Sequence, residues 1–346
     1  GPPPRMRGRS VKSSQYDRWR PPLAEDSVAR ARTRRLARVE ALTVIVPATD
    51  RPATLPSCLA AVHAADAGPD EVVVVEDPGG GGPAQARNLG AARANGELLC
   101  FVDADVEVHA DAFTRLRAAF AGNPDLVAAF GAYDDSPAAP GVVSGFRNLL
   151  HHHVHVTGAG PAQTFWAGLG AVRRDAFAAA GGFDAARFPH SSVEDIDLGM
   201  RLTAVGGRIV LDPSIQGTHL KAWTLPSMLR TDFARRGVPR VMLLLEAGPD
   251  GPRAGLNLGW RHRASALASL AVVGAGLRRR PVAAASALAA LAWLNRDLYA
   301  LLARRRGPGA AALGVGLHAL HHLAGVAAVP VGAAAHLWRA SERPRR

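Results

Sequence analysis

Short apolar runs alternate with alanine-rich helical segments over residues 41–120 of the chain. The apolar runs occupy residues 42–46, 71–75 and 98–102, and the alanine-rich segments occupy residues 55–67, 84–95 and 112–120. Continuous apolar strands separated by helices are typical of a mostly parallel sheet that is covered on both faces. We therefore predict an α/β fold, with a Rossmann-like sheet flanked by helices. Ligands of such sheets bind at the carboxyl ends of the strands.

A second pattern begins beyond about residue 250, where long stretches carry no charged side chain. Residues 264–277 and 281–294 are free of charge, but each has 14 residues, fewer than the roughly 20 that a helix needs to cross a bilayer. Residues 307–338 carry no Lys, Arg, Asp or Glu and are long enough to span. Interfacial aromatic residues are expected at the edges of such runs, where Trp293, Tyr299 and Trp338 stand. We predict an apolar, helical, membrane-associated region at residues 246–346. The number of crossings stays open, and a soluble helical bundle is the alternative.

The net charge of +12 is distributed unevenly. Residues 1–40 carry a net +7, residues 41–220 a net −9 and residues 221–346 a net +14. An acidic middle argues against a nucleic-acid-binding domain, which would need basic groups over its surface. Residues 1–40 are predicted to be a basic, flexible arm, of which residues 28–39 can become helical. The basic flanks suit contact with anionic lipid, and residues 41–245 are predicted to form the main folded domain.

Two carboxylates follow the third predicted strand. Asp103 and Asp105 are separated by one residue at the carboxyl end of that strand. Buried carboxylates are costly unless something pairs with them. A hard divalent cation that holds a diphosphate is a natural partner, because Mg²⁺ and Mn²⁺ prefer oxygen ligands. The pattern also occurs by chance in surface turns, and its place after an apolar strand favours the metal interpretation.

A second acidic cluster begins a predicted helix at residues 192–202. The helix dipole favours acids in the first turn, which accounts for Glu194 and Asp197. Asp197 and Arg201 are four residues apart and are predicted to form an ion pair on the helix surface. Asp195 has no such explanation. A carboxylate at a helix start near a metal site is a candidate general base.

The order and spacing of several motifs resemble the inverting, nucleotide-sugar-dependent glycosyltransferases of family 2, which have the GT-A fold. The matching pieces, over roughly residues 41–240, are Thr43-Val44-Ile45-Val46-Pro47, Ala86-Arg87-Asn88-Leu89-Gly90, Gly96-Glu97, Asp103-Ala104-Asp105, Gly181-Gly182-Phe183-Asp184, Glu194-Asp195, Arg201 and Gly206-Gly207. Each piece is weak alone, and the set in this order is specific. One motif departs from the family pattern. Glu76-Asp77-Pro78 and four glycines stand where an Asp-Asp-Gly-Ser type of turn is usual, which leaves base recognition open.

The resemblance implies roles for individual residues. It implies donor binding by Pro47, Glu76, Asp77, Arg87, Asn88, Asp103 and Ala104. It implies a divalent metal, Mg²⁺ or Mn²⁺, on Asp105 with Asp103, completed by His219, for which an ordinary loop histidine is the alternative. Asp195 resembles the base that deprotonates the acceptor hydroxyl. The acceptor-side residues are Trp166, Gly168, Glu194, Arg235 and Arg236. Trp166 stacks on a sugar or packs in the core, and Arg235 and Arg236 face a phosphate or are solvated.

Four histidines, His151, His152, His153 and His155, invite a metal interpretation. Neighbouring histidines on a helix point in different directions, which disfavours a transition-metal site built from these residues alone. An acceptor-side or membrane-facing role is more plausible.

We therefore predict a membrane-associated, metal-dependent, hexosyltransferase-like enzyme on the cytoplasmic face of the cytoplasmic membrane. It would move a sugar, with inversion, from a nucleotide-diphosphate donor to a lipid-linked acceptor or cell-envelope polysaccharide. Two alternatives stay open. A sugar-nucleotide nucleotidyltransferase should carry a lysine in a glycine-rich loop after the first strand, and residues 47–56 contain no lysine. A non-catalytic membrane scaffold would keep the fold without needing Asp103, Asp105 and Asp195.

Overall fold

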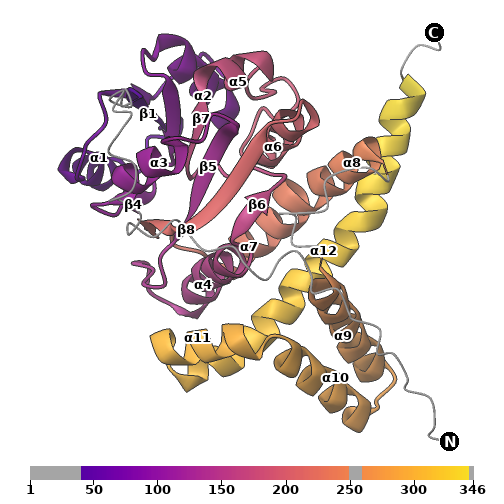
Figure 1. Cartoon of the computed structure of the whole chain (residues 1–346). Coiled ribbons are helices and arrows are strands. Elements are labelled where there is room, and N and C mark those ends of the chain that lie inside the picture. Colours follow the sequence, from indigo (N-terminus) through magenta and orange to yellow (C-terminus); the bar gives the residue numbers. More distant parts are fainter. Residues whose placement is uncertain (1–39, 249–258, 343–346) are drawn as a thin grey trace, which may run out of the picture. The chain divides into compact units, whose positions relative to one another are not determined.

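The computed structural model describes residues 40–248 and 259–342 (Figure 1). The predicted basic arm at residues 1–40, with its helix at residues 28–39, lies outside the described residues apart from Glu40. The same holds for residues 249–258 and 343–346 of the predicted C-terminal region.

One sheet of eight strands forms the centre of the folded domain, in the order β2-β1-β3-β7-β5-β8-β4, with β6 paired to β8. The strands are β1 (Leu42–Pro47), β2 (Glu71–Val75), β3 (Leu98–Val102), β4 (Val106–Val108), β5 (Leu126–Tyr133), β6 (Gly160–Ala162), β7 (Leu169–Arg173) and β8 (Arg208–His219). The three predicted strands form the parallel group β2-β1-β3. β7 runs antiparallel between β3 and β5, while β5 and β8 are parallel. The sheet is therefore mixed, and the predicted α/β class is confirmed.

The helices of this domain are α1 (Leu55–Ala64), α2 (Pro83–Arg93), α3 (Ala112–Phe120), α4 (Val142–Thr157), α5 (Arg174–Ala179), α6 (Glu194–Ala204), α7 (Leu225–Arg230), the π-helix η1 (Thr231–Gly237) and α8 (Val238–Ala247). Proline stands in the first turn of α1 and of α2, where its missing N–H costs no helical hydrogen bond. α1 ends three residues before the predicted boundary because Ala65 is extended. The sheet core is apolar, and Phe101 of β3 contacts the rings of Phe165, Phe177 and Phe183.

Close packing at one glycine holds the middle of α6 against the segment between β6 and β7. A Cβ at Gly199 would lie 2.2 Å from the backbone nitrogen of Phe165. We expect Gly199→Ala to lower the free energy of unfolding by about 1–3 kcal/mol, because overpacking against backbone outweighs the gain in helix propensity. Gly274→Ala is the matched control, since nothing lies within 4 Å of that position. Thermal unfolding of the full-length protein measures both, and equal midpoints for the two variants would contradict this packing.

The charge-free C-terminal runs form helices, as predicted. They are α9 (Trp260–Leu277), α10 (Pro281–Leu294), α11 (Arg296–Arg306) and α12 (Pro308–Glu342). By length and composition, Pro308–Ser341 is the one helix among the described residues that qualifies as a membrane span. α12 (yellow) runs beside α8 in Figure 1. The two helices pack closely, because a Cβ at Gly332 would lie 2.7 Å from the Cβ of Val241.

Candidate active site

The carboxyl end of β3 lies beside three other elements that carry candidate residues. Asp103 follows β3, and its backbone N–H donates to the carbonyl of Gly168, which precedes β7, at 3.0 Å. β8 ends at His219, which pairs in register with Val106 of β4, just after Asp105. α6 begins at Glu194, beside the loop before β7. The fold thus brings Asp103, Asp105, His219 and Asp195 to one edge of the sheet, although they are up to 116 residues apart in the sequence.

Arg87 joins two of the acids in the interior of the site. Its Nη2 lies 2.7 Å from Asp103 Oδ1, and its Nη1 lies 2.9 Å from Glu194 Oε1. Burial alone lowers the pKa of Arg87, but the two carboxylates outweigh burial and raise it. Arg87 is therefore charged, and its two ion pairs link the end of β3 to the first turn of α6. Its predicted contact with a donor diphosphate stays a prediction, because both terminal nitrogens already bind carboxylates.

Asp105 faces His219 across the site. His219 Nε2 lies 3.5 Å from Asp105 Oδ2, and the imidazole is buried, stacked on Tyr133 with ring centroids 4.0 Å apart. Burial raises the pKa of Asp105, but the nearby His219 and the charge of Lys221 outweigh burial and hold the pKa below its ordinary value. Asp105 is thus ionised and available as an oxygen ligand.

Asn148 of α4 fixes the tautomer of His219. Its Oδ1 lies 2.7 Å from His219 Nδ1 and accepts a hydrogen bond from Trp223 Nε1 at 3.1 Å. Because an indole N–H can only donate, the Asn148 atom is an oxygen, and His219 Nδ1 must be the protonated nitrogen. With both ring nitrogens protonated, Nε2 faces the Asp105 carboxylate as a donor, and once Nε2 loses its proton it faces the carboxylate with a lone pair. Two acceptors that face each other in this way favour a cation between them.

Asp195 is held at the first turn of α6. Its Oδ1 accepts from the backbone N–H of Ile196 at 2.8 Å, and its Oδ2 accepts from that of Ala167 at 3.3 Å. Burial and the charge of Glu194 raise the pKa of Asp195 to about 6, against the opposing effects of Arg87 and the two backbone N–H groups. A carboxylate with this pKa is suited to accept a proton near neutral pH. The predicted ion pair between Asp197 and Arg201 is present at 2.8 Å.

An aromatic and imidazole cluster lies on the other side of Tyr133. It consists of Tyr133, His151, His155 and Trp166, with ring centroids 4.1–5.0 Å apart. Burial lowers the pKa of His155 to about 4, so its imidazole is neutral. Trp166 is 9% exposed and folds over Gly168, where a Cβ would lie 2.3 Å from the indole. In this structure Trp166 packs in the cluster, and its acceptor role stays a prediction.

A cavity of about 450 Å³ opens at the carboxyl ends of β1 and β2. It is lined by Thr49, Asp50, Arg51, Glu76, Asp77, Pro78, Gly80 and Gly81. Glu76 and Asp77, predicted to contact the nucleotide, therefore line a cavity large enough for one. Of the other predicted donor residues, Asn88 clamps the backbone of Phe183, and the carbonyl of Ala104 accepts from Thr54. Pro47 ends the buried strand β1.

A second cavity, of about 510 Å³, lies beyond His219. It is lined by Lys221, Trp223, Thr224, Pro226, Ser227, Arg230, Thr231 and Arg235, a set with three basic side chains and no acid. The predicted acceptor-side residue Arg235 thus lines an open basic cavity. Arg236, its neighbour, is described separately below.

Comparison with known proteins adds the family. The family model described as Glycosyl transferase family 2 matches residues 78–179. No curated protein matches the sequence significantly. Among solved structures, the chain is similar to a mannosyltransferase of Pyrobaculum calidifontis in complex with GDP-Man and Mn²⁺, with 17% identity over 87% of this chain and 88% of that chain and a TM-score of 0.42. It is also similar to glucosyl-3-phosphoglycerate synthase of Mycobacterium tuberculosis in complex with Mn²⁺, UDP-glucose and glycerol 3-phosphate, with 16% identity over 54% of this chain and 74% of that chain and a TM-score of 0.36.

The matched segment runs from the turn after β2 to the end of α5 and includes Arg87, Asp103, Asp105, Asn148 and Gly168. Three of the eight motif pieces that carry the sequence resemblance lie inside it: Ala86–Gly90, Gly96-Glu97 and Asp103-Ala104-Asp105. Residues 78–179 therefore match the family 2 glycosyltransferase model, which agrees with the resemblance seen in the sequence.

Proposed function

We propose that this protein transfers a sugar from a nucleotide-diphosphate donor to a membrane-proximal acceptor, with inversion and with a divalent metal. The observation that carries the proposal is the juxtaposition of the Asp105–His219 pair with Asp195 at one sheet edge, beside a cavity of nucleotide size. Asp105 and His219 are suited to bind a metal ion that stabilises the departing diphosphate. Asp195, with a pKa of about 6, suits the acceptor's proton.

The residues present fit a divalent cation held by two protein ligands. Across residues 40–248 and 259–342, no three His, Cys, Asp or Glu side chains converge to form a metal cage. Mg²⁺ and Mn²⁺ sites that hold phosphates commonly use one or two protein ligands, with phosphate oxygens and water completing the shell. Asp105 and His219 would hold the cation, which supplies positive charge to the diphosphate. Asp103 lies beside these two ligands and forms an ion pair with Arg87. The two similar structures named above are complexes with Mn²⁺.

The residues of the site have different roles in the proposed reaction. Glu76 and Asp77 line the cavity that would receive the nucleoside. Arg87 holds Asp103 and Glu194 at fixed positions, so the first turn of α6 stays in place during turnover. Asp195 takes the proton of the acceptor hydroxyl as its oxygen bonds to the anomeric carbon. In the same step the bond from that carbon to the nucleoside diphosphate breaks, and the configuration is inverted. This chemistry requires a base and a stabilised leaving group and no covalent enzyme intermediate.

Nucleotide binding tests the proposal directly. We expect calorimetric titration of the full-length protein with UDP, GDP and dTDP to show binding of at least one nucleotide, and only when Mn²⁺ or Mg²⁺ is present. Asp105→Asn, which removes one ligand charge, should weaken that binding at least tenfold. Binding that ignores the metal, or no binding of any of the three, would favour the non-catalytic scaffold.

Asn148 should control metal affinity without touching the metal. We expect Asn148→Ala to weaken Mn²⁺ binding about 10- to 100-fold, because the outer partner of a ligating histidine sets its tautomer and ring orientation. Ser144→Ala is the matched control. Ser144 also lies on α4 and accepts from the backbone N–H of Trp223 at 2.9 Å, but does not contact His219. Titration of Mn²⁺ followed by electron paramagnetic resonance measures both variants, and equal affinities would contradict the assignment of His219 as a ligand.

We also propose that helices α9–α12 hold the catalytic domain at the cytoplasmic face of a membrane. The large, strongly exposed apolar side chains of the described C-terminal helices include Trp260, Leu267, Leu277, Val282, Trp293, Leu313, Leu337 and Trp338. Exposed apolar surface of this extent is typical of a membrane or protein interface. We expect the full-length protein to co-sediment with phosphatidylcholine vesicles, and more strongly when phosphatidylglycerol is added, because the flanks are basic. Protein that stays in the supernatant with both vesicle types would contradict membrane attachment.

A further inference from the structure

Three arginines from three helical elements lie together beside the candidate base. Arg147 is on α4, Arg236 on η1 and Arg240 in the first turn of α8; we call them the arginine cluster. Burial, and then the like charge of Arg236, lower the pKa of both Arg147 and Arg240 to about 10. Asp232, which forms an ion pair with Arg147 at 2.8 Å, precedes Arg236 and Arg240 by four and eight residues on the continuous helical segment η1–α8. This spacing of about one and about two turns places Arg236 and Arg240 on the same side of the segment as Asp232.

One carboxylate, that of Asp232, forms an ion pair with a member of the arginine cluster, and it also contacts His321. Asp232 is 5% exposed; its Oδ1 lies 2.8 Å from Arg147 Nη2 and its Oδ2 lies 2.8 Å from His321 Nδ1 of α12. Among the described residues, neither Arg236 nor Arg240 forms a hydrogen bond or ion pair, and the Nε of Arg240 is buried without a partner. In this part of the chain, no carboxylate therefore forms an ion pair with Arg236 or Arg240.

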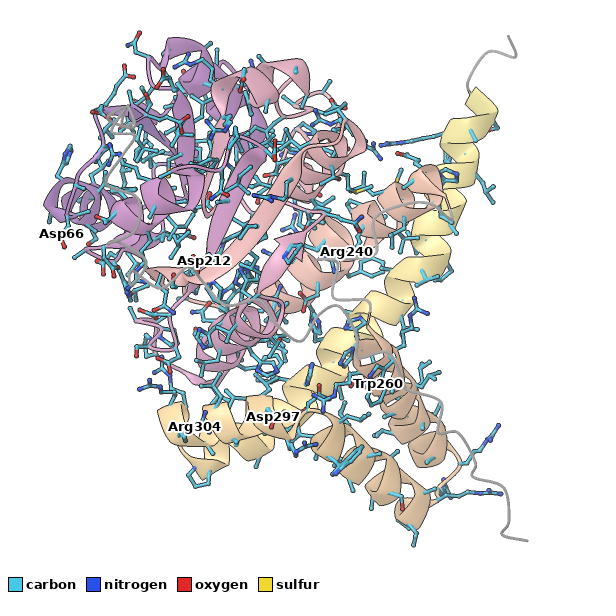
Figure 2. The ribbon with its side chains drawn as sticks, in the orientation of Figure 1. Asp66, Asp212, Arg240, Trp260, Asp297 and Arg304 are labelled. Carbon is cyan, nitrogen blue, oxygen red and sulfur yellow. The ribbon has the colours of Figure 1, made fainter. Side chains whose placement is uncertain are left out.

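The cluster lies between the candidate base and the apolar helices. The charge of Asp195 affects the pKa of Arg240. The charge of Arg236 affects the pKa values of three groups near the candidate base, namely Tyr133, His151 and His155. In Figure 2, Arg240 projects from the first turn of α8 on the side of the sheet. On the opposite side, Gly237 packs against Ala328 of α12, where a Cβ would lie 2.7 Å away. An anion bound here would therefore lie within the electrostatic reach of Asp195, and close to the packing of η1 against α12.

Partly buried cations without partners cost free energy, and an anionic ligand removes that cost. A carboxylate would offset one of the two unpaired charges, whereas a phosphate monoester, with about two charges near neutral pH, offsets both. The guanidinium fork also matches phosphate oxygens two at a time. Resting on the proposed function above, we propose that Arg236 and Arg240, with Arg147 behind them, bind a phosphate group of the acceptor. The phosphate belongs to a lipid or to a soluble acceptor, and both sources present the same chemistry.

Binding of defined phosphates to the full-length protein in detergent tests this assignment. The probes for calorimetry are farnesyl phosphate, glycerol 3-phosphate, and farnesol as the same lipid chain without phosphate. We expect the phosphates to bind, and Arg236→Gln and Arg240→Gln each to weaken them at least tenfold. Arg93→Gln is the matched control, because Arg93 is exposed in the last turn of α2. Arg235→Gln tests the outer cavity as a competing site. Binding at least tenfold tighter for farnesyl phosphate than for glycerol 3-phosphate assigns the phosphate to a lipid, and equal binding assigns it to a soluble acceptor.

Stability provides a readout that separates binding from structure. Because Arg240 carries an unpaired charge, Arg240→Gln without ligand should unfold at or above the wild-type temperature, and phosphate should stabilise the wild type more than the variant. A lower unfolding temperature together with unchanged phosphate binding would show a structural arginine and overturn the proposal. Equal binding of farnesol and farnesyl phosphate, or loss confined to Arg235→Gln, would also overturn it. Metal-dependent donor hydrolysis by the wild type is measured in parallel. Its absence with phosphate binding intact would overturn the glycosyltransferase function and leave the anion site standing.

Discussion

Asp105→Ala is expected to abolish metal-dependent sugar transfer while the protein stays folded. Asp105 supplies the charged ligand that faces His219, and without it the cation loses one of its two protein ligands. Loss of the charge that a metal gives to a leaving group costs several kcal/mol of transition-state stabilisation, or about 10³-fold in rate. The backbone contact between the carbonyl of Asp105 and the N–H of Leu220, at 2.9 Å, is kept in the variant. Turnover at saturating donor, Mn²⁺ affinity and thermal unfolding are the three measurements.

Asp66→Ala is the control for this variant, since Asp66 is exposed and lies in the turn after α1. It should retain wild-type turnover and wild-type metal affinity. An Asp105→Ala protein that turns over within threefold of wild type would contradict the metal site, whatever its stability.

Asp195→Asn is expected to reduce transfer about 10²- to 10⁴-fold, the range that general base catalysis contributes. Asparagine keeps one of the two side-chain oxygens, so it can retain the shorter hydrogen bond, from the backbone N–H of Ile196 at 2.8 Å. Metal and nucleotide binding should therefore be unchanged. The pH profile of the wild type gives a second measurement. The base acts only when deprotonated, so with a pKa of about 6 the rate should be level above that pH. Below it, the rate should fall about tenfold per pH unit.

Asp175→Asn is the control for the base, because Asp175 is also an acid in the first turn of a helix, and its Oδ1 accepts from the next backbone N–H at 2.7 Å. Unlike Asp195 it is exposed. Equal rates for the two variants, or a rate that rises as the pH falls below 6, would contradict Asp195 as the base.

Much of the catalytic half of the fold could be predicted from sequence because its signals are local. The strands β1, β2 and β3 are short continuous apolar runs, and such runs are buried on both faces of a parallel sheet. The acids that follow β3 and begin α6 could be assigned by position, since a strand end and a helix start place them. The sequence does not reveal that β7 inserts antiparallel between β3 and β5, because strand order depends on long-range pairing.

The partners of the site residues could not be predicted, since each depends on contacts between distant segments. Asn148 lies 71 residues before His219, which it orients. In the sequence it is followed by four histidines, which are the more conspicuous candidates for a metal site. The roles of Arg147 and Asp232 likewise depend on α4 meeting η1 and α12. The resemblance predicts Arg87 at the diphosphate, but no local pattern indicates that Asp103 and Glu194 both bind its guanidinium.

The most direct test of the central claim is consumption of a panel of UDP-, GDP- and dTDP-sugars by the full-length protein in detergent, with Mn²⁺ and with EDTA. We expect release of the nucleoside diphosphate from one donor in Mn²⁺, none in EDTA, and none from Asp105→Ala in either condition. Failure of every donor to release its nucleotide, or release that continues in EDTA and in Asp105→Ala, would contradict a metal-dependent glycosyltransferase.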